Sequence, residues 1–200
     1  MKNKILLPLL LLATLGLLAT LPQLANAHEH GSGSQDQDDN GHRTLAIFHI
    51  RLTGDAQVPS VNTEAFGFAY IRLFQNGTSS AIEFRVTVCD IANVTMSHIH
   101  VGSPTSNGAI AVHFIDLSSQ ISSAHGCTVL ASGIRGPNDL HPDPSAGVNT
   151  WADFVHALLS GNTYVNVHTT QNPKGEIRGQ LVFPGQSENR DQGEMHHQIA

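Results

Sequence analysis

The chain has 200 residues and a formal net charge of −6, with 10 Lys and Arg against 16 Asp and Glu. This acidic balance argues against nucleic-acid binding, because phosphate contacts require basic side chains. The length suits one domain with a sizeable core. The 13 histidines are numerous for a chain of this length, and they are the main clue to function.

The N-terminus predicts export. Lys2 and Lys4 precede an apolar run from Ile5 to about Leu24, and the run ends in the small-residue sequence of residues 25–27. A short basic region, an apolar region and an A-x-A site are typical of a secretory signal peptide, here residues 1–27. A membrane anchor is the alternative, which prolines and a glycine inside the run weaken. No later stretch is apolar enough to span a bilayer, so we expect a secreted or periplasmic protein.

Both ends of the exported chain are predicted to be disordered. Residues 28–43 form a leader rich in His and Asp without aliphatic residues, and residues 185–200 form a polar tail. The folded domain is expected between residues 44 and 184. Cleavage after residue 27 would expose His28 and His30. An N-terminal amine, two backbone amides and a His at the third position form a square-planar nitrogen site, a geometry that Cu²⁺ and Ni²⁺ favour. The alternative is a solvated leader with no metal.

Alternation of apolar and polar residues dominates the domain. Ala46, Phe48, Ile50 and Leu52 alternate with polar residues, which is typical of a strand with one buried face. Further strands are expected over residues 66–74, 82–88, 94–101, 109–117, 127–131, 163–169 and 176–183. Gly, Asn and Pro clusters between these segments indicate turns.

One segment has helical spacing instead. Its apolar residues are Trp151, Phe154, Val155, Leu158 and Leu159. Thr150 can cap its start and Gly161 can end it. Several antiparallel strands with one short helix near 150–160 predict a mainly β fold, either an antiparallel β-sandwich or a Greek-key barrel.

The chain contains two cysteines, Cys89 and Cys127. In an oxidising compartment an even number of cysteines favours a disulfide. Two buried thiols are the alternative.

His98 and His100 occupy positions i and i+2 of the predicted strand 94–101. A strand places such residues on one face, about 7 Å apart along the chain. Two imidazoles on one face can converge on one metal ion. The alternative is a pair of hydrogen-bonded polar residues that anchor a turn.

Four segments occur in an order that resembles the CHRD (chordin) domain family. They are LTGDAQVP at 52–59, HIHVG at 98–102 followed by NG at 107–108, YVNVHT at 164–169, and GEIRGQ at 175–180. The resemblance covers about residues 45–183. It implies the fold of that family, whose biochemical activity is poorly defined, and the growth-factor antagonism of chordin itself does not transfer to a lone domain.

A weaker resemblance is to the copper half of copper–zinc superoxide dismutase. His98, His100 and His168 match its order of copper ligands, and Arg178 matches the arginine that guides the anion. The bridging histidine and the zinc ligands have no clear match.

The strands 163–169 and 176–183 should form a hairpin that pairs His168 with Ile177 or Arg178. Alternatively Arg178 is structural and pairs with a carboxylate such as Glu176.

Most of the other histidines are expected to lie outside this cluster. His113 is interpreted as an exposed strand residue or a fourth ligand, and His49, His125, His141 and His156 as solvated. No catalytic triad or carboxylate pair stands out.

The sequence favours a binding module over an enzyme. The first hypothesis is an exported CHRD-domain module that binds copper, or less readily zinc, and has an extracytoplasmic protein as a partner. The second is a superoxide-dismutase-like redox enzyme. The third is a metal-free adhesion or ligand-binding domain.

Overall fold

The computed structural model of the protein describes residues 41–182, and for residues 116–125 it describes the backbone alone. The predicted signal peptide 1–27, most of the predicted leader 28–43 and the predicted tail 185–200 lie outside the described residues. Within residues 41–182, no helix has the length and apolar character that crossing a bilayer requires.

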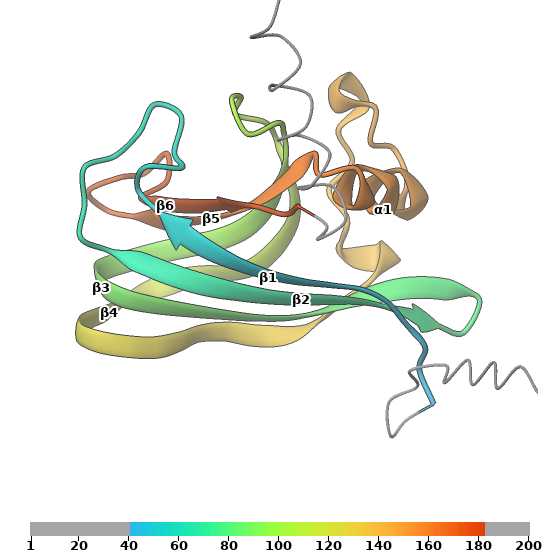
Figure 1. Ribbon diagram of the computed structural model, residues 1–200, viewed down its shortest axis with the longest axis horizontal. Helices are drawn as coiled ribbons and strands as arrows, with labels where there is room; N and C mark the ends of the chain where they lie inside the picture. The colour runs from blue at the N-terminus through green and yellow to red at the C-terminus, as the bar shows by residue number, and fades with distance from the viewer. Residues whose placement is uncertain (1–40, 183–200) are drawn as a thin grey trace, which may run out of the picture. The chain divides into compact units, whose positions relative to one another are not determined.

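The described chain forms six strands, two short 3-10 helices and one α-helix (Figure 1). In order they are β1 (Thr44–Thr53), β2 (Phe66–Asn76), β3 (Ser79–Val101), β4 (Ile110–Arg135), η1 (Pro137–Asp139), η2 (Pro144–Ala146), α1 (Trp151–Leu159), β5 (Thr163–Thr169) and β6 (Ile177–Gln180).

Two pairs of predicted strands are single strands in the structure. Segments 82–88 and 94–101 both belong to β3, and segments 109–117 and 127–131 both belong to β4. Asp90 and Asn93 adopt positive φ angles of 50° and 57° at the middle of β3. Several register shifts between β3 and β4 occur around these residues. The strand therefore continues through an irregular region that the sequence pattern presents as a break.

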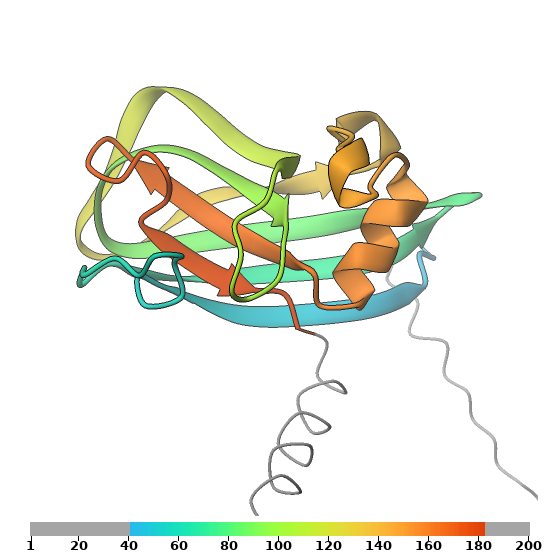
Figure 2. The same ribbon diagram turned by 90° about the horizontal axis from the view of Figure 1, so that it is seen from above.

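The strands close into a five-strand antiparallel barrel. The sheet order is β2-β1-β6-β5-β3-β4, and an additional β2–β3 pairing closes the first five strands of this order into a ring. The two halves of β4 run along the two halves of β3 as extra strands. Of the two predicted architectures, the structure is the barrel with one short helix and not the sandwich. Figure 2 shows α1 and the 3-10 helices at one end of this barrel.

The barrel interior is apolar and α1 covers one end of it. Phe48 and Leu52 of β1 and Val165 and Val167 of β5 belong to one buried cluster, to which Phe154 of α1 also contributes. These inward residues follow the alternation seen in the sequence, and their burial is the main driving force for the fold.

Helix α1 begins and ends where the sequence predicts. Thr150 adopts an extended conformation, and its hydroxyl accepts a hydrogen bond from the Asp153 N–H. The chain leaves the helix through Gly161, which has a φ of 73°. A left-handed residue just after a helix is a common C-terminal signal.

The predicted disulfide is confirmed. Cys89 of β3 and Cys127 of β4 are register partners and are bonded to each other. The bond lies beside the irregular middle of β3. A structural disulfide is typical of proteins that fold in an oxidising, extracytoplasmic space.

The predicted C-terminal hairpin is also confirmed, with a different register. Val167 pairs with Ile177, and Asn166 pairs with Arg178. The sequence instead predicts that His168 pairs with Ile177 or Arg178. The Glu176 N–H donates to the Val167 carbonyl at 2.8 Å, so the turn meets β5 one residue earlier than the sequence suggests.

Candidate metal centre

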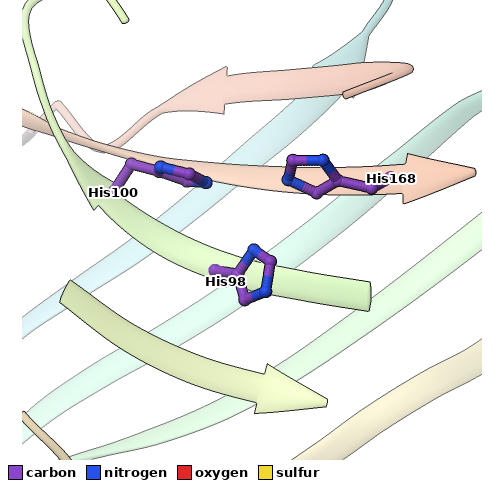
Figure 3. A group of neighbouring side chains, drawn as sticks. All are labelled: His98, His100 and His168. Atoms are coloured by element: carbon purple, nitrogen blue, oxygen red, sulfur yellow. The ribbon is translucent and has the colours of Figure 1, made fainter. Parts of the chain in front are cut away.

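Two neighbouring strands bring the three predicted ligands together. His98 and His100 come from β3, and His168 comes from β5, where it is the register partner of Met96. Their ligand nitrogens all lie within 4.8 Å of one another. Figure 3 shows the three rings around a common space, with one nitrogen of His98 turned towards the other two rings. The even-numbered positions of β5 therefore carry a polar face opposite the apolar one that fills the barrel.

The three imidazoles are buried and uncharged at neutral pH. His98 is fully buried, and His100 and His168 are each 7% exposed. Burial, followed by repulsion from His168 and His100, lowers the pKa of His98 to about 2. Burial also lowers the pKa of His100 to about 4, although the Gly108 carbonyl partly offsets it. The pKa of His168 is lowered by burial as well. Neutral imidazole is the form that binds metals.

Backbone carbonyls orient two of the rings. Nδ1 of His100 lies 3.0 Å from the Gly108 carbonyl oxygen, and Nδ1 of His168 lies 3.0 Å from the Pro173 carbonyl oxygen. A carbonyl oxygen only accepts, so each Nδ1 carries the hydrogen and each Nε2 keeps a lone pair. Metal-binding histidines commonly donate their other ring N–H in this way.

Within the described part of the chain, the remaining ring nitrogens have no hydrogen-bond partner. These buried atoms are Nε2 of His100, Nε2 of His168 and both ring nitrogens of His98. Buried polar atoms are almost always paired, so a group of unpaired ones calls for an explanation. A tetrahedral ion with bonds of about 2.0–2.1 Å holds its nitrogens roughly 3.4 Å apart. The rings therefore need to close by less than about 1.5 Å to share one ion.

Loops cover the polar face and explain why it is buried. Gln57, in the loop after β1, donates to the Asn166 side chain on β5 at 2.7 Å. Asn166 in turn donates to the Lys174 carbonyl in the β5–β6 turn at 3.3 Å. Asn107, in the loop between β3 and β4, donates to the Val58 carbonyl. Three separate loops are thus hydrogen-bonded over the histidines.

Tyr164 packs face to face against the His100 ring. The two rings are stacked, with centroids 4.9 Å apart and planes 3° from parallel. The Tyr164 hydroxyl accepts a hydrogen bond from the Gly108 N–H at 3.1 Å. A side chain at position 108 would collide with the Val101 carbonyl. Gly108 is therefore required by close backbone packing beside His100.

Arg178 makes the contacts of a structural arginine. It is 1% exposed, and its guanidinium lies 3.4 Å from the centroid of the Tyr164 ring. It donates to the side chains of Asn107 and Gln180 and to the carbonyls of Ser103 and Ser106. The predicted carboxylate partner is not used, because Glu176 bonds to Thr63 and Thr169 instead. An anion-guiding role for Arg178 stays a prediction.

Two further histidines lie beside the centre: sequence reasoning interpreted His113 as an exposed residue or a fourth ligand, and His141 as solvated. His113 of β4 is the register partner of His98, and their ring centroids are 4.5 Å apart. His141 is exposed, and its ring centroid lies 4.6 Å from that of His113. Of the two interpretations of His113, exposure is not observed, since the side chain is half-buried, and a ligand role stays a prediction. Antiparallel pairing of the predicted strands 94–101 and 109–117 is the signal that could have found it.

The other histidines either lie away from the centre or have side chains that the structure does not describe. His49 and His156 are exposed, as expected. The side chain of His125 belongs to the segment of which only the backbone is described.

The family model of the CHRD domain matches residues 48–181. The chain belongs to the CHRD family. All four resembling segments lie inside this match, and in the structure the last three surround the histidine cluster. In this CHRD domain the HIH segment supplies His98 and His100, the YVNVHT strand supplies His168 and Tyr164, and the GEIRGQ segment supplies Arg178. Comparisons with curated proteins and with solved structures give no match.

Proposed function

We propose that this CHRD protein binds a transition metal, copper in preference to zinc, through His98, His100 and His168. The observation that carries the proposal is a set of three buried imidazoles whose ligand nitrogens lie within 4.8 Å of one another and which include four ring nitrogens without a hydrogen-bond partner in the described part of the chain. Unpaired buried polar atoms are unfavourable. One metal ion would satisfy a nitrogen from each ring, whereas a metal-free adhesion domain would leave them all unpaired.

The donor set supports copper. All three ligands are neutral imidazoles, which suit both copper and zinc. A site of given nitrogen ligands generally binds Cu²⁺ more tightly than Zn²⁺. The order of the ligands along the chain also resembles the copper half of copper–zinc superoxide dismutase.

The proposed setting is outside the cytoplasm. The Cys89–Cys127 disulfide suits an oxidising compartment, and the pattern of residues 1–27 is that of a signal peptide. There the module would hold or carry copper, with an extracytoplasmic protein as the partner. A processed N-terminus would add a separate copper site at His28 and His30. A peptide of residues 28–40 should show square-planar copper absorption, and His30→Ala should abolish it.

Metal titration of residues 44–184 tests the domain site without the predicted leader and tail. We expect one equivalent of copper to bind and to raise the melting temperature. At free metal a hundredfold above Kd, the gain in stability is about 2.7 kcal/mol. His98→Ala and His168→Ala should remove most of this gain, and His49→Ala, on an exposed position of β1, should keep it. No rise with either copper or zinc would refute the proposal.

A redox enzyme is the second candidate. Three protein ligands leave a coordination position open, which catalytic metal sites require. When bound, copper would supply one-electron chemistry, and Arg178 is a cation close enough to His100 to lower the pKa of that imidazole. A superoxide assay on copper-loaded protein separates the two candidates, because a binding module has no activity above that of free copper.

A further inference from the structure

The proposed centre is closed to solvent, so an ion needs a way in. His98 is fully buried, and His100 and His168 are each 7% exposed. His100 and His168 are each bonded through Nδ1 to a carbonyl of a covering loop, that of Gly108 and that of Pro173 respectively. His98 has no such carbonyl contact among the described residues, and it lies next to strand β4, on which His113 is its register partner.

A row of imidazole rings runs from the surface to His98. His141 is exposed, His113 is half-buried and His98 is fully buried. The ring centroids are 4.6 Å apart between His141 and His113, and 4.5 Å apart between His113 and His98. Burial thus increases at each step of the row, while the spacing of the rings stays nearly constant.

The backbone fixes this row. His113 is the register partner of His98 across β3 and β4. The His141 N–H donates to the Ala111 carbonyl at 2.8 Å, which holds the segment after η1 against β4. An isolated bridge between Val112 and Leu140 fastens the same two segments. The order of the three rings is therefore set by the pairing of β3 with β4 and by the loop that is hydrogen-bonded to β4.

We infer that His141 and His113 form the entrance through which a metal ion reaches the three-histidine centre. This inference rests on the proposed function. Neither ring nitrogen of His98 has a hydrogen-bond partner among the residues that the structure describes, and Figure 3 shows one of them turned away from His100 and His168. His98 can therefore meet an ion on the side of His113 and, by rotation of its ring, bring that ion to the side of the other two ligands.

The transfer proceeds by exchange of neutral ligands. A hydrated ion replaces water by imidazole nitrogen at His141, then gains His113 and loses His141, then gains His98 and loses His113, and finally gains His100 and His168. Each imidazole binds through its lone pair, the displaced water returns to solvent, and the charge moves with the ion. Soft or borderline ions with a high affinity for imidazole, copper above all, suit such a path.

Copper(II) chloride binding to the full chain, followed by stopped-flow absorption, tests the entrance. His28, His30, His196 and His197 are replaced by Ala in every sample, so that terminal histidines do not contribute. His113→Phe keeps an aromatic ring beside His98 without ligand nitrogens, and His141→Ala alters only an exposed side chain. His156→Ala, on the exposed face of α1, is the matched control.

We expect the two entrance variants to slow copper uptake and release by the same factor, about tenfold, which is the low end for groups that support a metal site. Kd then stays constant, because the entrance is not part of the final site. His156→Ala should behave like the parent chain. Melting temperatures of the metal-free variants check folding, and His141→Ala decides the matter if His113→Phe is unstable.

Two outcomes would overturn the inference while leaving the proposed function intact. One is uptake at the parental rate in both entrance variants. The other is a weaker Kd with an unchanged uptake rate, which would make these residues ligands of the centre. If the parent chain itself takes up no copper at His98, His100 and His168, the proposed function fails first, and the entrance fails with it.

Discussion

Nδ1 of His168 lies 3.0 Å from the carbonyl oxygen of Pro173, in the turn that follows the strand carrying the histidine. Gly175 lets this turn close. Its φ is 121°, and a Cβ at this position would overlap the side-chain amides of Asn166 and Gln57. The orientation of a proposed ligand thus depends on a glycine and on two amides that are hydrogen-bonded to each other.

Gly175→Ala should therefore damage both stability and metal binding. We expect the free energy of unfolding to fall by about 2–4 kcal/mol from overpacking and backbone strain. Copper affinity should fall about tenfold, because the Pro173 carbonyl moves. Chemical denaturation and copper titration measure the two effects.

Gly77→Ala is the matched control for this change. Gly77 also has a positive φ, of 59°, but a Cβ there would meet nothing within 4 Å. Its cost should be about 1–2 kcal/mol, from the left-handed backbone alone, with copper affinity unchanged. Equal losses of affinity in the two variants would contradict the role given to the β5–β6 turn.

Arg178→Lys separates a structural role from a purely electrostatic one. Lysine keeps the positive charge but cannot reproduce the planar fork that binds the Asn107 side chain and the carbonyls of Ser103 and Ser106. We expect unfolding to become easier by about 2–4 kcal/mol, because buried acceptors lose their donors. Amide hydrogen exchange in residues 102–108 should speed up.

The exposed Arg85 of β3 provides the comparison. Arg85→Lys should change stability by no more than about 0.5 kcal/mol. Parental stability and exchange in Arg178→Lys would show that the charge alone matters, and would favour the anion-guiding role.

Loss of the disulfide should destabilise the domain strongly. Cys89 and Cys127 are 38 residues apart in sequence, and a loop of that length corresponds to about 4 kcal/mol in the chain-entropy description. The double variant Cys89→Ser, Cys127→Ser should lose about this much in urea unfolding. Thiol titration of the unfolded, unreduced parent should find no free thiol. Two thiols per chain would contradict the bond.

Local patterns were sufficient to predict much of this fold. The period-2 alternation of β1 and the helical spacing of α1 depend on which face each residue buries, and both elements appear where expected. The shared face of His98 and His100 follows from the same rule, since i and i+2 residues of a strand point the same way. His168 could be added only through its resemblance to known motifs, because pairing between distant strands leaves no local signal.

Long-range register explains what the sequence did not reveal. His113 lies opposite His98 only because β3 and β4 pair with several register shifts, including one between Ser97 and His98. A one-residue change in register turns a strand over, so alternation alone could not decide whether His113 meets the cluster. Barrel closure likewise depends on the β2–β3 pairing, which no single segment encodes.

The metal-free domain should lose stability on mild acidification. The pKa of His98 is lowered to about 2 and that of His100 to about 4, in both cases chiefly by burial. In the unfolded chain both imidazoles return to a pKa near 6.5. Between about pH 6.5 and pH 4 the unfolded state therefore binds more protons than the folded state does. Stability is greatest above pH 6.5 and falls as the pH decreases through this window.

Urea unfolding at a series of pH values measures the slope. Two such groups contribute roughly 2.7 kcal/mol per pH unit in the middle of the window, and the lowered pKa of His168 acts in the same direction. His98→Phe should make the slope shallower by about one proton, whereas His49→Ala, at an exposed position, should leave it unchanged. A parent chain whose stability is flat between pH 6.5 and pH 4 would mean that these imidazoles are not buried in neutral form, and the proposed centre would lose its physical basis.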